Sequence, residues 1–314
     1  MHVAAKSDIE RAVALLRSGG LVAFPTETVY GLGADASNPA ALEKIFLAKG
    51  RPQNHPIIVH LPDESHLSRW VRNIPDSARA LAKVFWPGPL TLVLERAPQV
   101  SDLITGGQHT VGLRIPGHPL ALELLRAFDS GIAAPSANRF GRLSPTTAAH
   151  VREELGDSVD LILDGGPCEV GIESTIMDLS SEPPVLLRPG IVSKREIEDA
   201  IGQTLATRGA TRAPGTLPSH YAPATPLKIV SEAELDAAVA AQPEAQVAVL
   251  SRRQSERKNW LRAPGDAAAY AHDLYENLRA LDRMRCELIL VEEVPATEEW
   301  AAIRDRLTRA AGKG

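Results

Sequence analysis

The chain has 314 residues, of which 44% are hydrophobic and 23% are charged. This is the composition of a globular protein, and the length is sufficient for two domains of ordinary size. Residues 1–200 contain 19 lysines and arginines against 24 aspartates and glutamates, and residues 201–314 contain 15 of each kind. Because neither part has the basic excess of a nucleic-acid-binding module, strong RNA binding is not expected to be the main activity.

Cysteine usage and targeting signals give no support to an exported or membrane-bound protein. The two cysteines, Cys168 and Cys286, lie far apart in the sequence, so neither a disulfide framework nor a zinc site is indicated. The first residues contain no apolar signal core, and no apolar run reaches the roughly eighteen residues of a membrane span. We therefore expect a reduced, cytoplasmic protein without a membrane contact.

The first two hundred residues alternate strand-like and helix-like segments. A helix starting at Pro39 is well marked, because Asn38 can cap it, Pro39 suits its first position and Gly50 can end it. The expected strands are 21–24, 56–60, 90–94, 111–115, 131–135, 159–163, 174–178 and 185–188. The other expected helices are 76–85, 119–128 and 146–155. This order favours an α/β or α+β fold with a large mixed sheet, in a domain of residues 1–202.

The composition changes after residue 202. Residues 203–226 contain four prolines, two glycines and no periodic apolar pattern, so we expect an extended linker, called the strap below, which carries His220 and Tyr221. Beyond the strap, strands 227–230, 247–250 and 287–291 alternate with helices 232–241, 267–282 and 298–310. These three repeats predict a small, Rossmann-like parallel sheet in a second domain of residues 227–314.

Common nucleotide and catalytic motifs are absent or misplaced. Gly31–Ala36 fits the dinucleotide-binding pattern, but six residues separate it from the preceding strand and the next helix begins only after the motif has ended. The sequence contains no Gly-x-x-x-x-Gly-Lys loop, no His-Glu-x-x-His pair and no Gly-x-Ser-x-Gly turn. A nucleotide site must therefore be built in another way.

Lys49 and Arg51 suggest how such a site is built. Lysine supplies a compact charge and arginine a planar donor fork, so the two cations at the end of the helix suit a polyphosphate. A solvated surface pair is the commoner fate of such a segment, and Lys49-Gly50-Arg51 alone leaves that alternative open.

Four segments together resemble a known family. They are Pro25-Thr26-Glu27-Thr28-Val29-Tyr30-Gly31-Leu32-Gly33, Lys49-Gly50-Arg51, Arg114-Ile115-Pro116 and Ala134-Pro135-Ser136-Ala137-Asn138. In this order they resemble the YrdC-type family, specifically its two-domain threonylcarbamoyl-AMP synthases, whose signature is Lys-x-Arg followed by Ser-x-Asn. The resemblance continues through Trp86–Thr91, Gly171–Thr175, Leu187–Gly190 and the His220-Tyr221 pair, while residues 227–314 match only in length and architecture.

The resemblance implies a nucleotidyltransferase with a specific reaction. L-threonine, bicarbonate or carbon dioxide, and ATP with Mg²⁺ give threonylcarbamoyl-AMP and pyrophosphate. The product feeds threonylcarbamoyladenosine synthesis beside the tRNA anticodon through downstream tRNA-modifying transfer proteins, and a weak contact with tRNA itself stays open. Such an enzyme chiefly positions two anions that repel one another, which requires cationic donors.

The resemblance also assigns site residues. L-threonine is expected to bind Thr28, His60, Arg114 and Ala134, with Arg114 on its carboxylate. ATP is expected to bind Lys49, Arg51, His55, Thr110, Ser136, Asn138, Ser144, Arg188 and Tyr221, of which Lys49 and Arg51 are the expected catalytic residues. His55 stands where the family commonly has asparagine, and no metal ligand is assigned.

Individual positions also have structural explanations. Arg114 could pair with a carboxylate, Ser136 and Asn138 could cap a turn, and Thr28 and His60 could satisfy backbone groups. Arg188 could likewise be structural. The occurrence of all these residues in the order of the family favours the functional interpretation.

Two other functions are weighed against the synthase. The same fold is associated with a module that binds double-stranded RNA or tRNA, but the acidic balance of residues 1–200 weighs against it. A carbamoyl-transferring relative with a different acceptor, as in hydrogenase maturation, would carry zinc-finger-like cysteine pairs and an acylphosphatase-like segment, and neither occurs in this chain.

Overall fold

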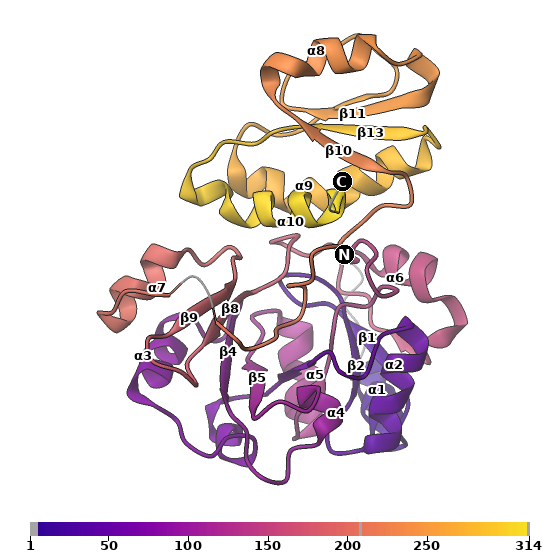
Figure 1. Ribbon diagram of the computed structural model, residues 1–314. Helices are drawn as coiled ribbons and strands as arrows, with labels where there is room; N and C mark the ends of the chain where they lie inside the picture. The colour runs from indigo at the N-terminus through magenta and orange to yellow at the C-terminus, as the bar shows by residue number, and fades with distance from the viewer. Residues whose placement is uncertain (1–5, 207–208, 313–314) are drawn as a thin grey trace.

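The computed structural model describes residues 6–206 and 209–312, which form two sheets, one above the other in Figure 1. The first sheet contains β1 (Val22–Phe24), β2 (Gly31–Asp35), β3 (Ile58–His60), β4 (Leu90–Glu95), β5 (Thr110–Arg114), β6 (Ile132–Ala133), β7 (Leu161–Ile162), β8 (Thr175–Asp178) and β9 (Val185–Arg188). The accompanying helices are α1 (Lys6–Arg17), α2 (Pro39–Lys49), η1 (Glu64–Arg69), α3 (Asp76–Phe85), α4 (Asp102–Thr105), α5 (Pro119–Phe128), α6 (Ala148–Leu155), η2 (Gly156–Ser158) and α7 (Lys194–Ile201).

The first sheet is mixed, as expected. Its strand order is β7-β1-β2-β6-β3-β5-β4-β8-β9, and antiparallel pairs such as β1 with β2 occur beside parallel pairs such as β3 with β5. The parallel pairing of β3 with β5 places His60 directly opposite Arg114, at the carboxyl ends of both strands. The sheet therefore brings together two residues that the sequence separates by more than fifty positions.

Helices cover both faces of this sheet. Side chains alternate between the faces of a strand, so Val22 and Phe24 of β1 lie in the cluster made with α1 and α5, while Ala23 belongs to the larger cluster on the other side. Leu42 of α2 and Leu81 of α3 lie in that larger cluster. The sheet is thus buried between two layers of helices. The loops at the carboxyl ends of its strands are not needed for this packing and can form a site.

The strand β2 was not predicted from the sequence. Gly31–Ala36, considered in the sequence only as a nucleotide motif, contains the whole of β2, which pairs antiparallel with β1. A Cβ at Gly33 would come 2.8 Å from the Phe24 ring and 2.9 Å from Ile132. Glycine therefore permits the close packing here, although glycine-rich segments do not look like strands in a sequence.

Other elements were also missed. The helices α1, α4 and α7 were not expected, although α7 carries a readable start signal, a capping box between Ser193 and Glu196. The boundaries of α2 agree with expectation at both ends. Asn38 accepts from the amides of Ala40 and Ala41, and Gly50 ends the helix in the left-handed conformation.

The second sheet is parallel throughout, which confirms the expected Rossmann-like arrangement. Its strands β10 (Leu227–Val230), β11 (Val247–Ser251), β12 (Trp260–Arg262) and β13 (Leu288–Glu292) lie in the order β10-β13-β11-β12. The accompanying helices are α8 (Glu232–Ala240), η3 (Glu244–Gln246), α9 (Ala267–Arg283), η4 (Glu298–Trp300) and α10 (Ala301–Ala311). Figure 1 shows α8 on the outer face of this sheet, and α9 and α10 on the face turned toward the first sheet. The strand β12 and the short helix η3 were not expected.

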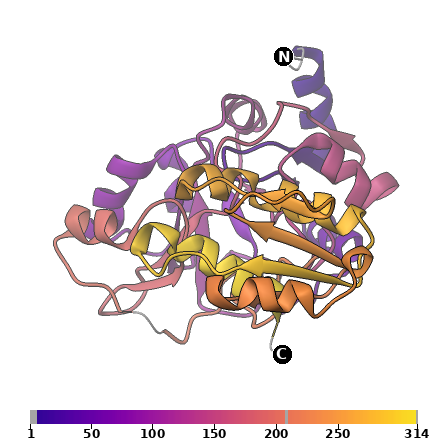
Figure 2. The same cartoon turned by 90° about the horizontal axis from the view of Figure 1, so that it is seen from above.

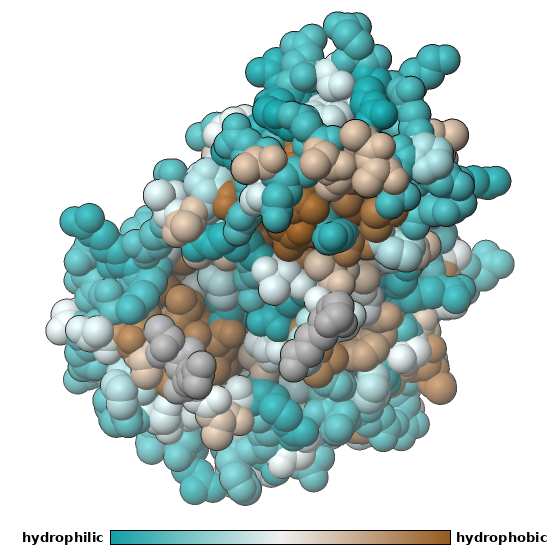
Figure 3. Space-filling view, turned by 45° about the horizontal axis from the view of Figure 1, so that its top comes forward, coloured by the Kyte–Doolittle hydropathy of each residue, from teal (hydrophilic) through white to brown (hydrophobic). Residues whose placement is uncertain are grey.

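The helices α9 and α10 pack against the first part of the chain. Val29, Leu143 and Ile172 of the first part share one buried cluster with Leu274 of α9 and Ile303 of α10. Seen from above, the yellow and orange segments lie across the first part (Figure 2). In the space-filling view, hydrophobic side chains gather mainly in the middle of the molecule and hydrophilic ones cover most of the remaining surface (Figure 3).

Residues 203–206 and 209–226 form no helix or strand and run between the two sheets (Figure 1). Polar contacts hold this strap along its length. The amide of Arg212 donates to Gln108 Oε1 at 2.7 Å, that of Ala222 to the Gly141 carbonyl at 2.9 Å, and that of Thr225 to Asp282 Oδ1 at 2.8 Å. No helix in the part of the chain described here is long and apolar enough to cross a membrane.

Candidate active site

A small cavity lies at the carboxyl ends of β3 and β5, beneath the strap. Pro214, Gly215, His220 and Tyr221 of the strap form one wall. The volume of about 50 Å³ is enough for a few water molecules but far below the roughly 300–1,000 Å³ of a typical ligand pocket. The strap therefore contributes one wall of a cavity that, as it stands, is too small for a large substrate.

Eight residues expected from the sequence line this cavity: Thr28, Arg51, His60, Arg114, Ala134, Ser136, Arg188 and Tyr221. Five expected residues do not line it: Lys49, His55, Thr110, Asn138 and Ser144. Thr110 instead lines a separate crevice, together with Gln108 and Arg212.

Arg114 is a firmly anchored cation of the cavity. Its Nε donates to the Gly88 carbonyl at 3.1 Å, its Nη1 donates to Thr28 Oγ1 at 2.9 Å, and its Nη2 forms an ion pair with Glu27 at 2.7 Å. Arg114, Thr28 and Glu27 are all buried. This network fixes the guanidinium plane in one orientation, ready to receive a second carboxylate.

His60 adds a neutral polar group beside Arg114. Burial, and then the positive charge of Arg114, lower the pKa of His60 to about 3. Its Nδ1 is buried and has no hydrogen-bond partner. Since buried polar atoms in proteins are nearly always bonded, this nitrogen is a natural contact for a small polar ligand.

Lys49 lies behind the cavity wall and not in it. Its Nζ donates to the main-chain carbonyl oxygens of Ser136 and Asn138, both at 2.5 Å. The side-chain amide of Asn138 donates in turn to the carbonyls of Arg139 and Arg142. Lys49 therefore fixes the Ser-x-Asn loop to the end of α2, and burial holds the pKa of its ammonium well below the usual value.

Arg51 reaches the cavity from the same helix end. Its Nη2 donates to the Pro56 carbonyl at 2.8 Å, its guanidinium lies 5.5 Å from the centre of the Phe140 ring, and its buried Nε has no partner. Burial lowers the pKa of Arg51 to about 10, so the group stays charged at neutral pH. The half-buried ring of His55 lies 5.2 Å from the same Phe140 ring, outside the cavity wall.

Arg188 joins the strap to the first sheet. Its Nη2 and Nε donate to the Ser174 carbonyl, and its Nη1 donates to the Pro214 carbonyl at 3.0 Å and lies 3.5 Å from the Tyr221 hydroxyl. Ser144 lies deeper and donates to Glu173 at 2.5 Å.

Several cavity residues were not assigned from the sequence. Thr26, Glu173, Ser174 and His220 line the cavity. Glu173 and Ser174 belong to the Gly171–Thr175 motif already noted, so the motif was an available signal. His220 has a buried Nδ1 without a partner, and burial lowers its pKa to about 3.

In the described parts of the chain, no group of three or more His, Cys, Asp or Glu side chains is placed to hold a metal ion.

Comparisons with known proteins cover both parts of the chain. A family model described as "Telomere recombination", for Sua5, YciO and YrdC proteins, matches residues 14–190. A second model, described as "Threonylcarbamoyl-AMP synthase, C-terminal domain", matches residues 192–312.

Individual relatives agree with these models. A Bacillus subtilis protein named threonylcarbamoyl-AMP synthase is 41% identical, with 97% of this chain and 93% of its own length covered. The Schizosaccharomyces pombe protein of the same name is 37% identical, with 98% and 88% covered. The crystal structure of Pyrococcus abyssi Sua5 complexed with L-threonine has a TM-score of 0.93 at 39% identity, over 99% of this chain and 96% of that chain. With both halves matched in one relative of the same length, the chain belongs to the Sua5/YrdC family, in its two-domain form.

Proposed function

We propose that the protein is a threonylcarbamoyl-AMP synthase, which joins L-threonine, bicarbonate or carbon dioxide, and ATP and releases pyrophosphate. The observation that carries the proposal is the convergence of Thr28, His60 and Arg114 on one buried cavity whose other wall holds Arg51 and Arg188. Relatives that align over nearly the whole chain bear the name of this enzyme, and one of them has been solved with L-threonine.

The threonine half of the site is proposed to consist of Thr28, His60, Arg114 and Ala134. Arg114 would bind the substrate carboxylate through its planar donor fork, which Glu27 and the Gly88 carbonyl hold in place. The free ring nitrogen of His60 would accept or donate one further hydrogen bond. The close apolar surface of Ala134 would limit the size of the side chain that fits.

The nucleotide half is proposed to lie between Arg51, Ser136, Arg188 and Tyr221. Two buried guanidinium groups with few carboxylate partners suit a polyphosphate, because they offset its charge where water is excluded. Lys49 would contribute its charge from behind the Ser136 carbonyl, without needing to touch the phosphates in the closed form. His55, Thr110, Asn138 and Ser144 remain predicted nucleotide residues that would act only after the strap moves.

The chemistry requires positioning and no covalent bond to the protein. The threonine amine adds to carbon dioxide and loses a proton, which gives a carbamate. A carbamate oxygen then attacks the α-phosphorus of ATP, and the bond from that phosphorus to the pyrophosphate oxygen breaks. Since both partners are anions, cations that hold them together supply most of the catalysis. We propose that Mg²⁺ arrives with ATP as part of the substrate.

We also propose that residues 1–202 form the catalytic domain, residues 203–226 a closing strap and residues 227–314 the second domain. Closure would exclude water, which matters because carbamates lose carbon dioxide and mixed anhydrides of this kind hydrolyse. The product would pass in the cytoplasm to tRNA-modifying transfer proteins. A weak contact with tRNA stays a prediction.

Pyrophosphate release from ATP tests the proposal. The full-length protein should release pyrophosphate only when L-threonine and bicarbonate are both present, and serine in place of threonine should give a weaker signal. Release that does not depend on an amino acid would contradict the synthase assignment, and no release under any combination would favour an RNA-binding module without synthase activity.

A further inference from the structure

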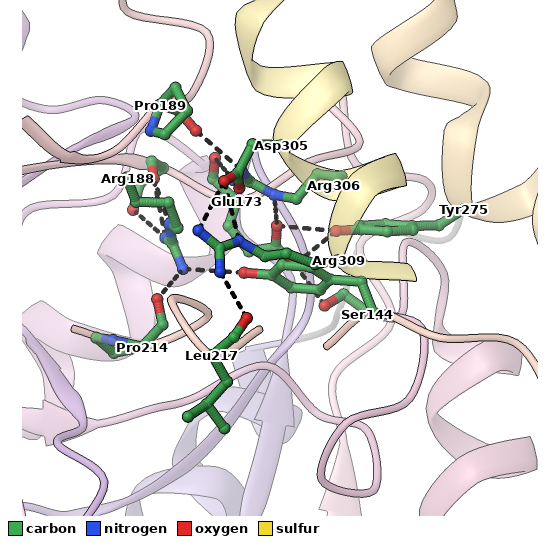
Figure 4. Close-up of polar contacts among 12 residues, drawn as sticks. Ser144, Glu173, Arg188, Pro189, Pro214, Leu217, Tyr275, Asp305, Arg306 and Arg309 are labelled. Atoms are coloured by element: carbon green, nitrogen blue, oxygen red, sulfur yellow. Dashed lines mark hydrogen bonds and ion pairs between the residues drawn. The ribbon is translucent and has the colours of Figure 1, made fainter. Parts of the chain in front are cut away.

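Arg306 belongs to α10 of the second domain but is buried beside the candidate active site. Its side chain has an exposed fraction of 0%. Its Nε donates to Glu173 Oε2 at 2.8 Å and its Nη1 donates to the Pro189 carbonyl at 2.9 Å, as Figure 4 shows. A fully buried arginine is rare unless its charge is needed, so this position calls for an explanation.

Glu173, which lines the cavity, accepts hydrogen bonds from side chains of both parts of the chain. Besides Arg306, it accepts from Ser144 Oγ at 2.5 Å and from the Tyr275 hydroxyl of α9 at 3.0 Å (Figure 4). Burial alone would raise the pKa of Glu173, but the charges of Arg306 and Arg188 and the Ser144 hydrogen bond outweigh it and lower the pKa to about 2. A negative charge therefore stands in the wall of a cavity that is proposed to receive a polyphosphate.

That charge would oppose nucleotide binding if it were not compensated. A buried carboxylate that loses its partner repels phosphate and competes with it for a cation, which here is Arg188, the other positive charge that acts on Glu173. Arg306 prevents both effects, because its guanidinium is bonded to the carboxylate without being part of the cavity lining.

Arg306 also supports Tyr221. Its guanidinium lies 5.2 Å from the centre of the Tyr221 ring, and the Tyr275 ring lies 5.9 Å from it. Tyr221 has a φ of 58°, in the left-handed region that residues with a side chain adopt only when their surroundings hold them there. The second domain thus supplies part of what keeps this strap residue in the cavity wall.

We propose that Arg306 is a positioning residue for nucleotide binding, which neutralises Glu173 and holds the Tyr221 ring from the second domain. The inference rests on the proposed function and gives the second domain a direct part in forming the ATP site. The threonine side should be unaffected, because Arg114 is held by Glu27, Thr28 and Gly88 of the first domain.

Calorimetric titration of the full-length protein with MgATP, and separately with L-threonine, tests this role. Arg306→Gln should weaken MgATP binding about tenfold or more and change threonine binding less than about twofold, since only the nucleotide side gains an uncompensated charge. Arg304→Gln is the matched control. Arg304 lies on the same helix, but its Nη1 donates to the Pro295 and Thr297 carbonyls within the second domain, so both affinities should stay at wild-type values.

A double variant separates charge compensation from a merely structural role. Glu173→Gln combined with Arg306→Gln removes the stranded charge and should bind MgATP more tightly than Arg306→Gln alone, and Arg306→Lys should also recover part of the affinity. If Arg306→Gln does not fold by circular dichroism, the double variant is compared with Glu173→Gln, and similar MgATP affinities are expected.

Four results would count against these proposals. A double variant that binds MgATP no better than the single variant, or equal losses for MgATP and threonine, would overturn the inference. Unchanged MgATP binding in Arg306→Gln would overturn it as well. A wild-type protein that binds no MgATP would instead contradict the proposed function.

Discussion

Lys49 and Asn138 are joined by a 2.5 Å hydrogen bond from the lysine ammonium to the main-chain carbonyl of the asparagine. A second bond of the same length joins Lys49 to the Ser136 carbonyl, 87 residues away in the sequence. The Lys-x-Arg and Ser-x-Asn segments therefore form one structural unit. This contact changes what the lysine is expected to do, because its ammonium orders the loop whose Ser136 lines the cavity.

Lys49→Ala should reduce threonylcarbamoyl-AMP formation and also lower stability, because two buried carbonyl oxygens lose a charged donor. Each such contact is worth about 1.5–3 kcal/mol. Arg51→Ala should reduce activity with a smaller loss of stability, since it gives up one carbonyl contact. Pyrophosphate release and urea unfolding measure the two effects.

Lys44→Ala is the matched control for Lys49→Ala. Lys44 lies on the same helix and also donates to a carbonyl, that of Gly19 at 2.6 Å, but it is exposed and remote from the cavity. Its substitution should leave activity at the wild-type rate. Wild-type activity in a folded Lys49→Ala variant would show that Lys49 is not needed for threonylcarbamoyl-AMP formation.

Arg114→Ala should raise the KM for threonine far more than the KM for ATP, because Arg114 lies beside His60 on the threonine side. It also strands the buried Glu27, which costs about 3–5 kcal/mol when a buried pair is broken. Glu27→Gln combined with Arg114→Gln avoids that penalty. The double variant should still raise the KM for threonine far more than the KM for ATP. A larger change in the KM for ATP than in the KM for threonine would indicate that Arg114 binds the phosphates.

Serine should be a poor substrate and not an inert one. The site is proposed to recognise the γ-methyl group of threonine by packing, and one missing methyl is worth only about 1–3 kcal/mol of discrimination. The ratio of kcat/KM values for threonine and serine, measured by pyrophosphate release, should therefore lie between about 5 and 150. Equal values would argue against a threonine pocket.

Local sequence signals predicted most of the helices and strands, whereas contacts between residues far apart in the sequence determined how the site is assembled. Helices α3 and α5 agree with expectation at both ends, because proline and aromatic residues mark where they begin and end. By contrast, the contact of Glu173 with Arg306 joins residues 133 positions apart, and nothing local indicates it. The resemblance placed Thr28 and Arg114 in one site, but the structure was needed to find Lys49 behind the loop.

Acidification should destabilise the protein through two buried histidines, His60 and His220. Burial lowers the pKa of both to about 3, whereas an unfolded histidine binds its proton near pH 6.5. Between these values the unfolded state binds more protons, so the free energy of unfolding falls as pH falls from about 6.5. Each histidine contributes a slope of up to about 1.4 kcal/mol per pH unit.

Urea unfolding at pH 7.5 and pH 5.5 measures this dependence. The pKa of Glu173 is about 2, below its ordinary value of 4.5. Glu173 therefore lowers the free energy of unfolding only when the pH falls below that ordinary value, outside the measured range. His220→Asn should make the decrease between pH 7.5 and pH 5.5 smaller than in the wild type. An unchanged decrease would mean that His220 is protonated in the folded protein.

Gly215→Ala should disturb the closed strap. Gly215 has a φ of +76°, and a Cβ there would overlap the Tyr221 hydroxyl oxygen, so the tyrosine or the strap backbone must shift. Threonylcarbamoyl-AMP yield should fall and the KM for ATP should rise. Gly202→Ala is the control, because Gly202 has a similar φ of +65° but no atom within 4 Å of the added Cβ, which leaves backbone strain alone. If both variants lose the same activity, the strain and not the displaced Tyr221 is responsible, and the strap has no specific role in nucleotide binding.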